Sequence, residues 1–501
     1  MAARLHHSLH GQYSVERAFA LEDYTGSVSF CRALFVCVAT VLPPLFSILL
    51  FDVAPLRDPS EGWDRNGMMW ARLFGSVALL TIGILLQLRA DVPDAPLTVK
   101  RSLAITIITS AGYTAWLMMF AKLWAYPIPF GFFIGIPAWC FFFLVAAAIM
   151  IGVKPLQERP ELQAQLLVFS KQMTVASSFL PIYLAYSTLF TRFSGSSRLA
   201  LVFALPVIKF VLKRIIAKVA EDLVDRMPLR VVSVDVFNAL YQAKCMQSSG
   251  SLWTVVVIIG IDAAQNVFSI RRLMQHVDRM KGLGSHTSTL LTSFDLLGNL
   301  VEALADPGQL NLHSVLTLRA RSCTRVDLPA SKNMILQQIE EVQQKARRGA
   351  SDAKTSRQIS TMDLLPPAAL PASPVPKQKS TVVPWVSTPP HELIPTTSTA
   401  QMISVNQVLP ASSVSAEPDQ SRPISNALEL LWKCELLLLV EYIEFAIPVL
   451  YAVYLSILYH LPNARYYPDT SAMTRDQLHT AIISILLYAA LEIASLACVH
   501  Q

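Results

Sequence analysis

Long apolar runs alternate with short polar stretches along most of the chain. Six runs suit bilayer-spanning helices by length and apolarity: 33–51, 68–88, 103–123, 128–153, 174–190 and 199–212. A seventh run follows at 252–270, and two more, 436–458 and 478–499, form a hairpin near the C-terminus. The pattern predicts an all-α fold, a polytopic bundle of transmembrane helices.

The stretch 231–246 is less apolar, but the distribution of basic residues favours a further span there. With this span counted and the N-terminus inside, the inner segments hold 31 of the 41 Lys and Arg residues and the outer segments hold 6. Without it, Arg271 and Arg272 would lie outside at the membrane edge, against the rule that basic residues near span ends stay cytoplasmic. We therefore predict about ten spans with both termini cytoplasmic. The alternative is a re-entrant loop at 231–246.

The spans divide the chain into two membrane blocks separated by a long polar segment. The predicted parts are a cytoplasmic N-terminal segment 1–32, an eight-span block 33–270, a cytoplasmic loop 271–427, and a two-span hairpin with a short C-terminus at 428–501. Within the loop we expect short amphipathic helices at 290–304 and 331–348, the second capped by Ser331. The Pro-, Ser- and Thr-rich stretch 366–423 is expected to be disordered.

Composition agrees with a membrane protein and gives no indication of an enzyme. Hydrophobic residues make up 53% of the chain and charged residues 15%, which is too apolar for a soluble protein of this size. The 7 cysteines form no CxxC pair, and phosphate-loop, dinucleotide, HExxH and GxSxG motifs are all missing. We therefore predict no catalytic residue, no metal and no cofactor. The net charge of +6 does not indicate nucleic acid binding, and the expected location is the plasma membrane.

Several predicted spans contain polar side chains that are costly to place in a bilayer. The candidates for an intramembrane polar site are Lys209, Asp235, Asn238, Gln242, Asp262, Asn266, Glu441, Glu444 and Glu492. Spacings of three and four place many of them on shared helix faces, so we expect them to converge near mid-membrane. Two interpretations stay open. The groups line a path for a cation or a proton-coupled solute, or they join helices through structural ion pairs and hydrogen bonds.

The segments predicted to be cytoplasmic contain candidate interaction sites. A basic stretch after the sixth predicted span is typical of a contact with anionic lipid: Lys213, Arg214 and Lys218. Ser322 follows two arginines and is a candidate kinase site, and 371–374 fits a PxxP ligand for a Pro-motif binder. Glu435, close to the inner boundary, is expected to be solvated.

Four stretches resemble a family of multi-pass membrane proteins from oomycetes: 11–17, 55–63, 440–444 and 461–468. The resemblance covers both membrane blocks and omits the proline-rich loop. It implies the multi-pass architecture and brings no activity or ligand.

Two classes of function therefore stay open. Kinked spans and intramembrane acids favour a channel or secondary transporter for a cation or a proton-coupled solute. The long cytoplasmic loop favours a non-transporting scaffold or receptor-like protein. A continuous polar cavity that reaches the acids from either face would favour transport, whereas dry, paired acids would favour the scaffold.

Overall fold

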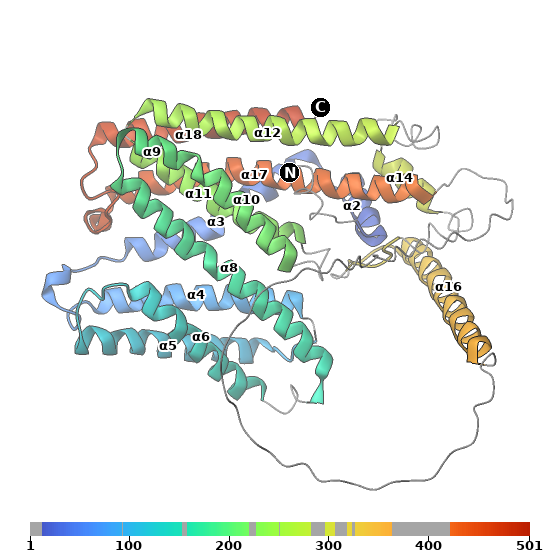
Figure 1. The fold of residues 1–501 in the computed structure, drawn as a ribbon. Coiled ribbons are helices and arrows are strands. Elements are labelled where there is room, and N and C mark those ends of the chain that lie inside the picture. Colours follow the sequence, from blue (N-terminus) through green and yellow to red (C-terminus); the bar gives the residue numbers. More distant parts are fainter. Residues whose placement is uncertain are drawn as a thin grey trace, which may run out of the picture.

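The protein is a polytopic bundle of α-helices (Figure 1). The computed structural model describes residues 13–92, 94–152, 158–219, 227–249, 251–281, 296–305, 318–322, 326–362 and 421–500, and no strand lies within them. The helices are α2 (Val15–Ser27), α3 (Phe30–Val53), α4 (Gly67–Asp91), α5 (Val99–Leu123), α6 (Gly131–Ile151), α8 (Pro160–Arg192), α9 (Gly195–Val202), α10 (Ala204–Val219), α11 (Met227–Ser249), α12 (Leu252–Lys281), α14 (Leu296–Ala305), α16 (Ala330–Met362), α17 (Ser421–His460) and α18 (Arg475–His500). Short 3-10 turns η1 (Pro59–Glu61) and η4 (Pro462–Tyr466) lie in two connections. The predicted fold class is confirmed.

Eight of the described helices are long and apolar enough to cross a bilayer: α3, α4, α5, α6, α8, α12, α17 and α18. They run between two ends of the molecule (Figure 1). We call the end with the short connections, such as α11–α12 and α17–α18, the hairpin end. We call the opposite end, which carries α2, α14 and α16, the module end. The chain is thus a multi-pass membrane protein.

The predicted span 199–212 is not one continuous helix. Helix α9 ends at Val202, Phe203 separates it from α10, and α10 begins at Ala204. The cause is Pro206, which has no backbone N–H and whose ring collides with the carbonyl four residues earlier, that of Val202. The predicted span therefore corresponds to two helical pieces in series, α9 and α10.

The less apolar stretch 231–246 forms part of a continuous helix, α11, of 23 residues. A helix of that length measures about 35 Å and can cross the hydrocarbon core. Its low apolarity is explained by its position, because α8, α10, α12, α17 and α18 all pack around it. The polar residues of α11 therefore face other helices. The stretch 231–246 is thus helical over its whole length.

Helices α4, α5 and α6 form a unit of their own, packed closely at two glycines. A side-chain carbon at Gly112 would collide with the Phe142 ring, and one at Gly135 would collide with Tyr113. An apolar core joins this unit to the first half of α8 through residues such as Leu162 and Phe169. The buried polar side chains of α10, α11, α12, α17 and α18 therefore lie outside this unit, in a separate bundle.

The module end contains a folded unit that the sequence did not predict. It combines α2, the segment 318–322, α14, α16 and the first turns of α17, and we call it the end module. Its buried apolar residues are Tyr13, Val15, Ala18, Phe19, Leu300, Leu304, Leu318, Ala320, Leu336, Ile339, Ile424, Ala427, Leu428 and Trp432. The same core continues into α8, α10 and α11. The N-terminal segment and the long loop, predicted as separate parts, therefore fold together against the bundle.

Buried polar contacts fix α2 within the end module. Ser14 caps the helix by accepting from the Arg17 N–H. The Glu16 side chain is buried and accepts from the Ser322 N–H at 2.7 Å and the Val326 N–H at 3.3 Å. Burial, followed by the charge of nearby Glu435, raises the pKa of Tyr13 to about 12. Helix α2 is thus tied to a segment some 300 residues further along the chain.

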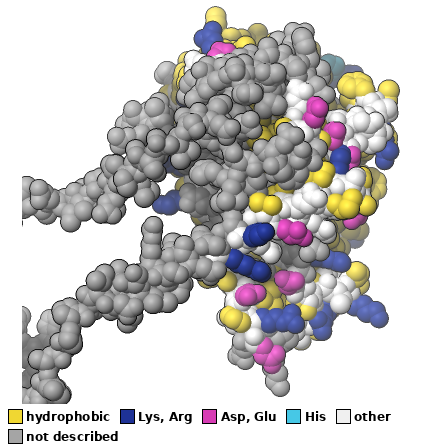
Figure 2. All heavy atoms as spheres, turned by 90° about the vertical axis from the view of Figure 1, so that its right-hand side faces the viewer, with side chains coloured by type: hydrophobic (Ala, Val, Ile, Leu, Met, Phe, Trp, Pro, Cys, Tyr) yellow, Lys and Arg dark blue, Asp and Glu magenta, His cyan; other side chains and the backbone are white. Residues whose placement is uncertain are grey.

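Ion pairs add to this attachment and correct one expectation. Arg17 binds Glu435 of α17 at 2.6 Å, so Glu435 is paired rather than solvated. Lys332 of α16 binds Glu22 at 2.6 Å and Asp23 at 2.5 Å. Figure 2 shows the molecule from the module end, where acidic and basic side chains intermix on the described surface.

The loop helices differ in length from their predicted ranges. Helix α14 begins at Leu296, and residues 290–295 of the predicted helix lie outside the described residues. Helix α16 begins at Ala330 and ends at Met362, so Ser331 lies inside its first turn instead of capping it. Most of the proline-rich stretch 366–423, including the PxxP pattern at 371–374, lies outside the described residues.

Candidate functional site

Polar side chains from five helices meet inside the C-terminal bundle. Lys209 of α10 is buried and its ammonium contacts the Glu444 carboxylate of α17. The same ammonium lies 3.3 Å from Asp235 Oδ1 of α11. Lys213, one helical turn beyond Lys209, approaches that oxygen to 2.7 Å. The two lysines thus neutralise Asp235 and Glu444.

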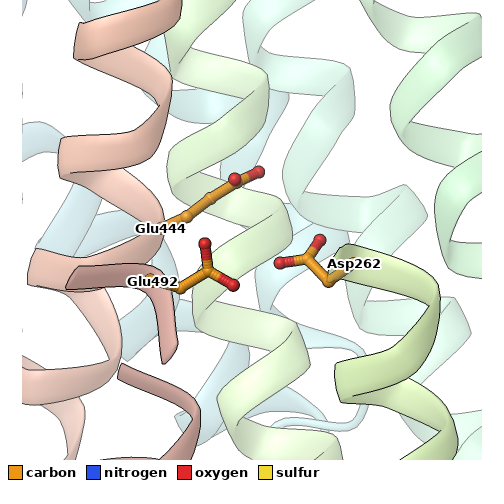
Figure 3. A group of neighbouring side chains, drawn as sticks. All are labelled: Asp262, Glu444 and Glu492. Atoms are coloured by element: carbon orange, nitrogen blue, oxygen red, sulfur yellow. The ribbon is translucent and has the colours of Figure 1, made fainter. Parts of the chain in front are cut away.

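Three carboxyl groups lie beside this pair of lysines. Oxygens of Asp262, Glu444 and Glu492 all lie within 4.8 Å of one another, and all three residues are buried. Figure 3 shows the side chains extending from α12, α17 and α18 toward a common space. Carboxyl groups so close in a dry interior cannot all be ionised without a compensating proton or cation.

Hydrogen-bond donors occupy several oxygens of this acidic centre. The Asn266 amide donates to Glu492 Oε2 at 2.8 Å, and the Tyr488 hydroxyl donates to Asp262 Oδ2 at 2.7 Å. An oxygen of Glu492 also lies within 4.8 Å of an oxygen of Asp262. Two carboxyl groups can share a hydrogen bond only when one of them carries a proton. The arrangement of Asp262 and Glu492 therefore fits a proton-sharing pair.

Glu441 lies one turn before Glu444 on the same face of α17. It is fully buried, and neither of its oxygens makes a hydrogen bond of ordinary geometry within the described residues. No lysine in the described bundle pairs with Glu441, so its charge has no direct compensation.

A small cavity reaches the acidic centre from the side of α9 and α10. It has room for about one water molecule. Its lining comprises Tyr186, Val202, Leu205, Pro206, Asn238, Gln242, Cys245, Ile258, Ile261, Asp262 and Gln265. Asn238 donates to Gln242 Oε1 at 3.2 Å. The predicted amides of α11 thus lie at the cavity, next to an acid of α12.

Polar contacts close the bundle at the hairpin end. Lys244 binds Asp469 at 2.8 Å, and Gln247 donates to the Asp469 carbonyl at 3.2 Å. The Tyr451 hydroxyl donates to Gln247. These contacts join the end of α11 to α17 and to the α17–α18 connection.

A second network at the hairpin end joins the two membrane blocks. The buried Asp52, at the end of α3, binds Arg72 of α4 at 2.5 Å. Its carboxylate also accepts from the Tyr467 hydroxyl at 2.5 Å and the Tyr454 hydroxyl at 2.9 Å. Asn463 donates to the Asp52 carbonyl at 2.6 Å. The C-terminal hairpin is therefore held against α3 and α4.

The structure brings most of the predicted polar residues into contact. Lys209, Asp235 and Glu444 form one group, while Asp262, Asn266, Glu444 and Glu492 form the adjoining one. Asn238 and Gln242 line the cavity, and Glu441 lies one turn from the centre. Sequence reasoning missed Tyr488 and assigned Lys213 to lipid. The spacing of these two residues could have identified them, because residues four apart lie on the same face of a helix. Tyr488 precedes Glu492 by four residues, and Lys213 follows Lys209 by four.

Comparisons of the chain with protein-family models, with curated proteins and with solved structures found no match.

Proposed function

We propose that this multi-pass membrane protein is a proton-coupled secondary transporter. Its proton site is the acidic centre formed by Asp262, Glu444 and Glu492 with Lys209. The centre takes up a proton from one side and releases it to the other as the helices around it rearrange.

The charge balance of the centre is the observation that carries this proposal. Five buried carboxyl groups face two lysines: Asp235, Asp262, Glu441, Glu444 and Glu492 against Lys209 and Lys213. Three acids therefore have no cationic partner in the described bundle. An uncompensated charge in a dry interior costs several kcal/mol, so the surplus is neutralised by protons or bound cations. Groups of this kind exchange protons when access changes.

Helix geometry supports rearrangement around the centre. The α9–α10 crossing is interrupted next to Pro206, and α17 contains Pro448 one turn after Glu444. Prolines free backbone carbonyls and weaken the helix at these points. Discontinuous helices beside a charged site are typical of secondary transporters. The cavity lined by Asp262 would form the first part of a proton path to the acidic centre from the side of α9 and α10.

We also propose that the end module is cytoplasmic and that the hairpin end faces outward, with the plasma membrane as the location. The basis is the excess of Lys and Arg in segments on the module side. In intact cells, a membrane-impermeant thiol reagent should label a cysteine at Asp64, which is exposed at the hairpin end, in a background without exposed native cysteines. It should not label a cysteine at Met334 on α16. Labelling at Met334 in intact cells would overturn the orientation.

Infrared spectroscopy tests whether the centre holds an exchangeable proton. A protonated carboxyl group has a carbonyl stretching band that a carboxylate lacks. We expect this band in the purified protein at neutral pH, and we expect it to weaken in Glu492→Gln. The control is Glu61→Gln, an exposed acid of the hairpin end, which should leave the band unchanged. A wild-type protein without the band at neutral pH, with all five acids ionised, would count against a proton site.

The end module favours one alternative, a non-transporting scaffold or receptor-like protein. The Ser322 N–H bonds to the buried Glu16, so a phosphate on Ser322 would place negative charge beside that carboxylate. A cytoplasmic kinase therefore stays a proposed partner, as does anionic lipid at the exposed Arg214 and Lys218. Lys213 is engaged with Asp235 and does not belong to that lipid contact. Absence of any proton movement through the bundle would favour this alternative.

A further inference from the structure

The cavity between α8, α9, α10, α11 and α12 has the chemistry of a small cation site. We propose that it binds one dehydrated monovalent alkali cation, Na⁺ or K⁺, through Asn238, Gln265 and Asp262. This inference names a ligand for the space beside the proposed proton site. The proposal that the ion binds does not depend on proton transport. A role of the ion in transport that is coupled to protons rests on the proposed function.

An amide oxygen without a hydrogen-bond partner belongs to the residues that line this cavity. Asn238 donates one N–H to Gln242 Oε1, and its buried Oδ1 has no hydrogen-bond partner in the described structure. Gln265 donates one N–H to the Ile261 carbonyl at 3.4 Å. Both amides therefore keep their oxygens for another ligand. A buried acceptor left without a partner destabilises the fold, and a bound cation would remove this cost.

Size and charge restrict the ligand. The cavity has room for about one water molecule, so it admits a bare alkali ion and excludes an organic solute in this conformation. Amide and carboxylate oxygens are the ligands that hard cations prefer, and they replace the hydration shell of the ion. Asp262 is the only acid among the lining residues. Its single charge matches a monovalent ion, and the nearby Lys209 ammonium disfavours a divalent one.

Thermal unfolding of the purified, detergent-solubilised full chain tests the proposal. Sodium or potassium chloride should raise the unfolding midpoint by about 2–4 °C over choline chloride at equal ionic strength. Binding of radioactive sodium should be saturable and displaced by unlabelled sodium or potassium chloride. Calcium chloride should give no larger rise than choline chloride at matched ionic strength.

Two variants locate the effect at the cavity. Asn238→Leu removes the unpartnered oxygen at similar volume, and Gln265→Leu removes the second amide oxygen in case the first variant folds poorly. Both should lose the salt-specific rise and the sodium binding. The matched control is Gln172→Leu, a fully buried and unpartnered amide of α8 outside the cavity, which should keep both.

Equal midpoints in alkali chloride and choline chloride, with no saturable sodium binding, would overturn the proposal and leave water as the occupant. A response to calcium alone would overturn it as well. Retention of sodium binding in both cavity variants would place the ion elsewhere and equally reject this site. A protein that binds sodium but moves no protons would refute the transport function alone.

Discussion

Replacing Lys209 with methionine is expected to lower the free energy of unfolding by about 3–5 kcal/mol. The ammonium of Lys209 is buried between Glu444 and Asp235, so its loss leaves Glu444 without a cationic partner. The charge of Asp235 is less affected, because Asp235 retains its ion pair with Lys213 at 2.7 Å. Unfolding of the purified protein by denaturant, followed by tryptophan fluorescence, measures the change.

Two further variants show whether the loss of stability in Lys209→Met comes from the lost charge or from altered packing. Lys209→Met combined with Glu444→Gln should regain most of the lost stability, because the pair is then neutral on both sides. Lys244→Met is the matched control. Its partner Asp469 lies at the partly exposed hairpin end, and a pair of this kind contributes about 0–1 kcal/mol. Wild-type stability in Lys209→Met would mean that no ionised pair exists at the centre.

The membrane architecture was predictable because it depends on local patterns. Apolar run length located the eight long apolar helices, and the 31-to-6 division of basic residues favoured a crossing at 231–246, where the structure has the continuous helix α11. Helical spacing also placed Asp235, Asn238 and Gln242 on one stripe. A hydropathy pattern alone would have missed α11, because its polar face is covered by neighbouring helices rather than by lipid.

Contacts between distant segments were not predictable in the same way. Glu16 binds the backbone near Ser322, and Arg17 binds Glu435, across several hundred residues of chain. Nothing in the polar N-terminal segment identifies these partners, because an ion pair leaves no periodic signal. Lys213 illustrates the same limit. A basic residue at the end of a span can bind an anionic lipid or pair with a buried acid. The packing of α10 on α11 is what brings Lys213 to Asp235.

The largest expected effect of a single substitution is loss of proton flux in Glu492→Gln. Glutamine keeps the size of the side chain and an oxygen acceptor for Asn266, so the bundle should fold with stability within about 1 kcal/mol of wild type. It cannot take up or release a proton. Because the proposed mechanism needs that step in every cycle, flux should fall to the level of protein-free vesicles.

Proton entry into proteoliposomes that enclose a pH-sensitive dye is the measurement that tests the transport proposal most directly. The vesicles contain sodium and potassium chloride on both sides, and a pH gradient is imposed across them. The wild type and the Glu61→Gln control should acidify the interior faster than protein-free vesicles, and Glu492→Gln should not. Equal acidification by wild type and Glu492→Gln, or none by correctly folded wild type, would contradict a proton-carrying acidic centre.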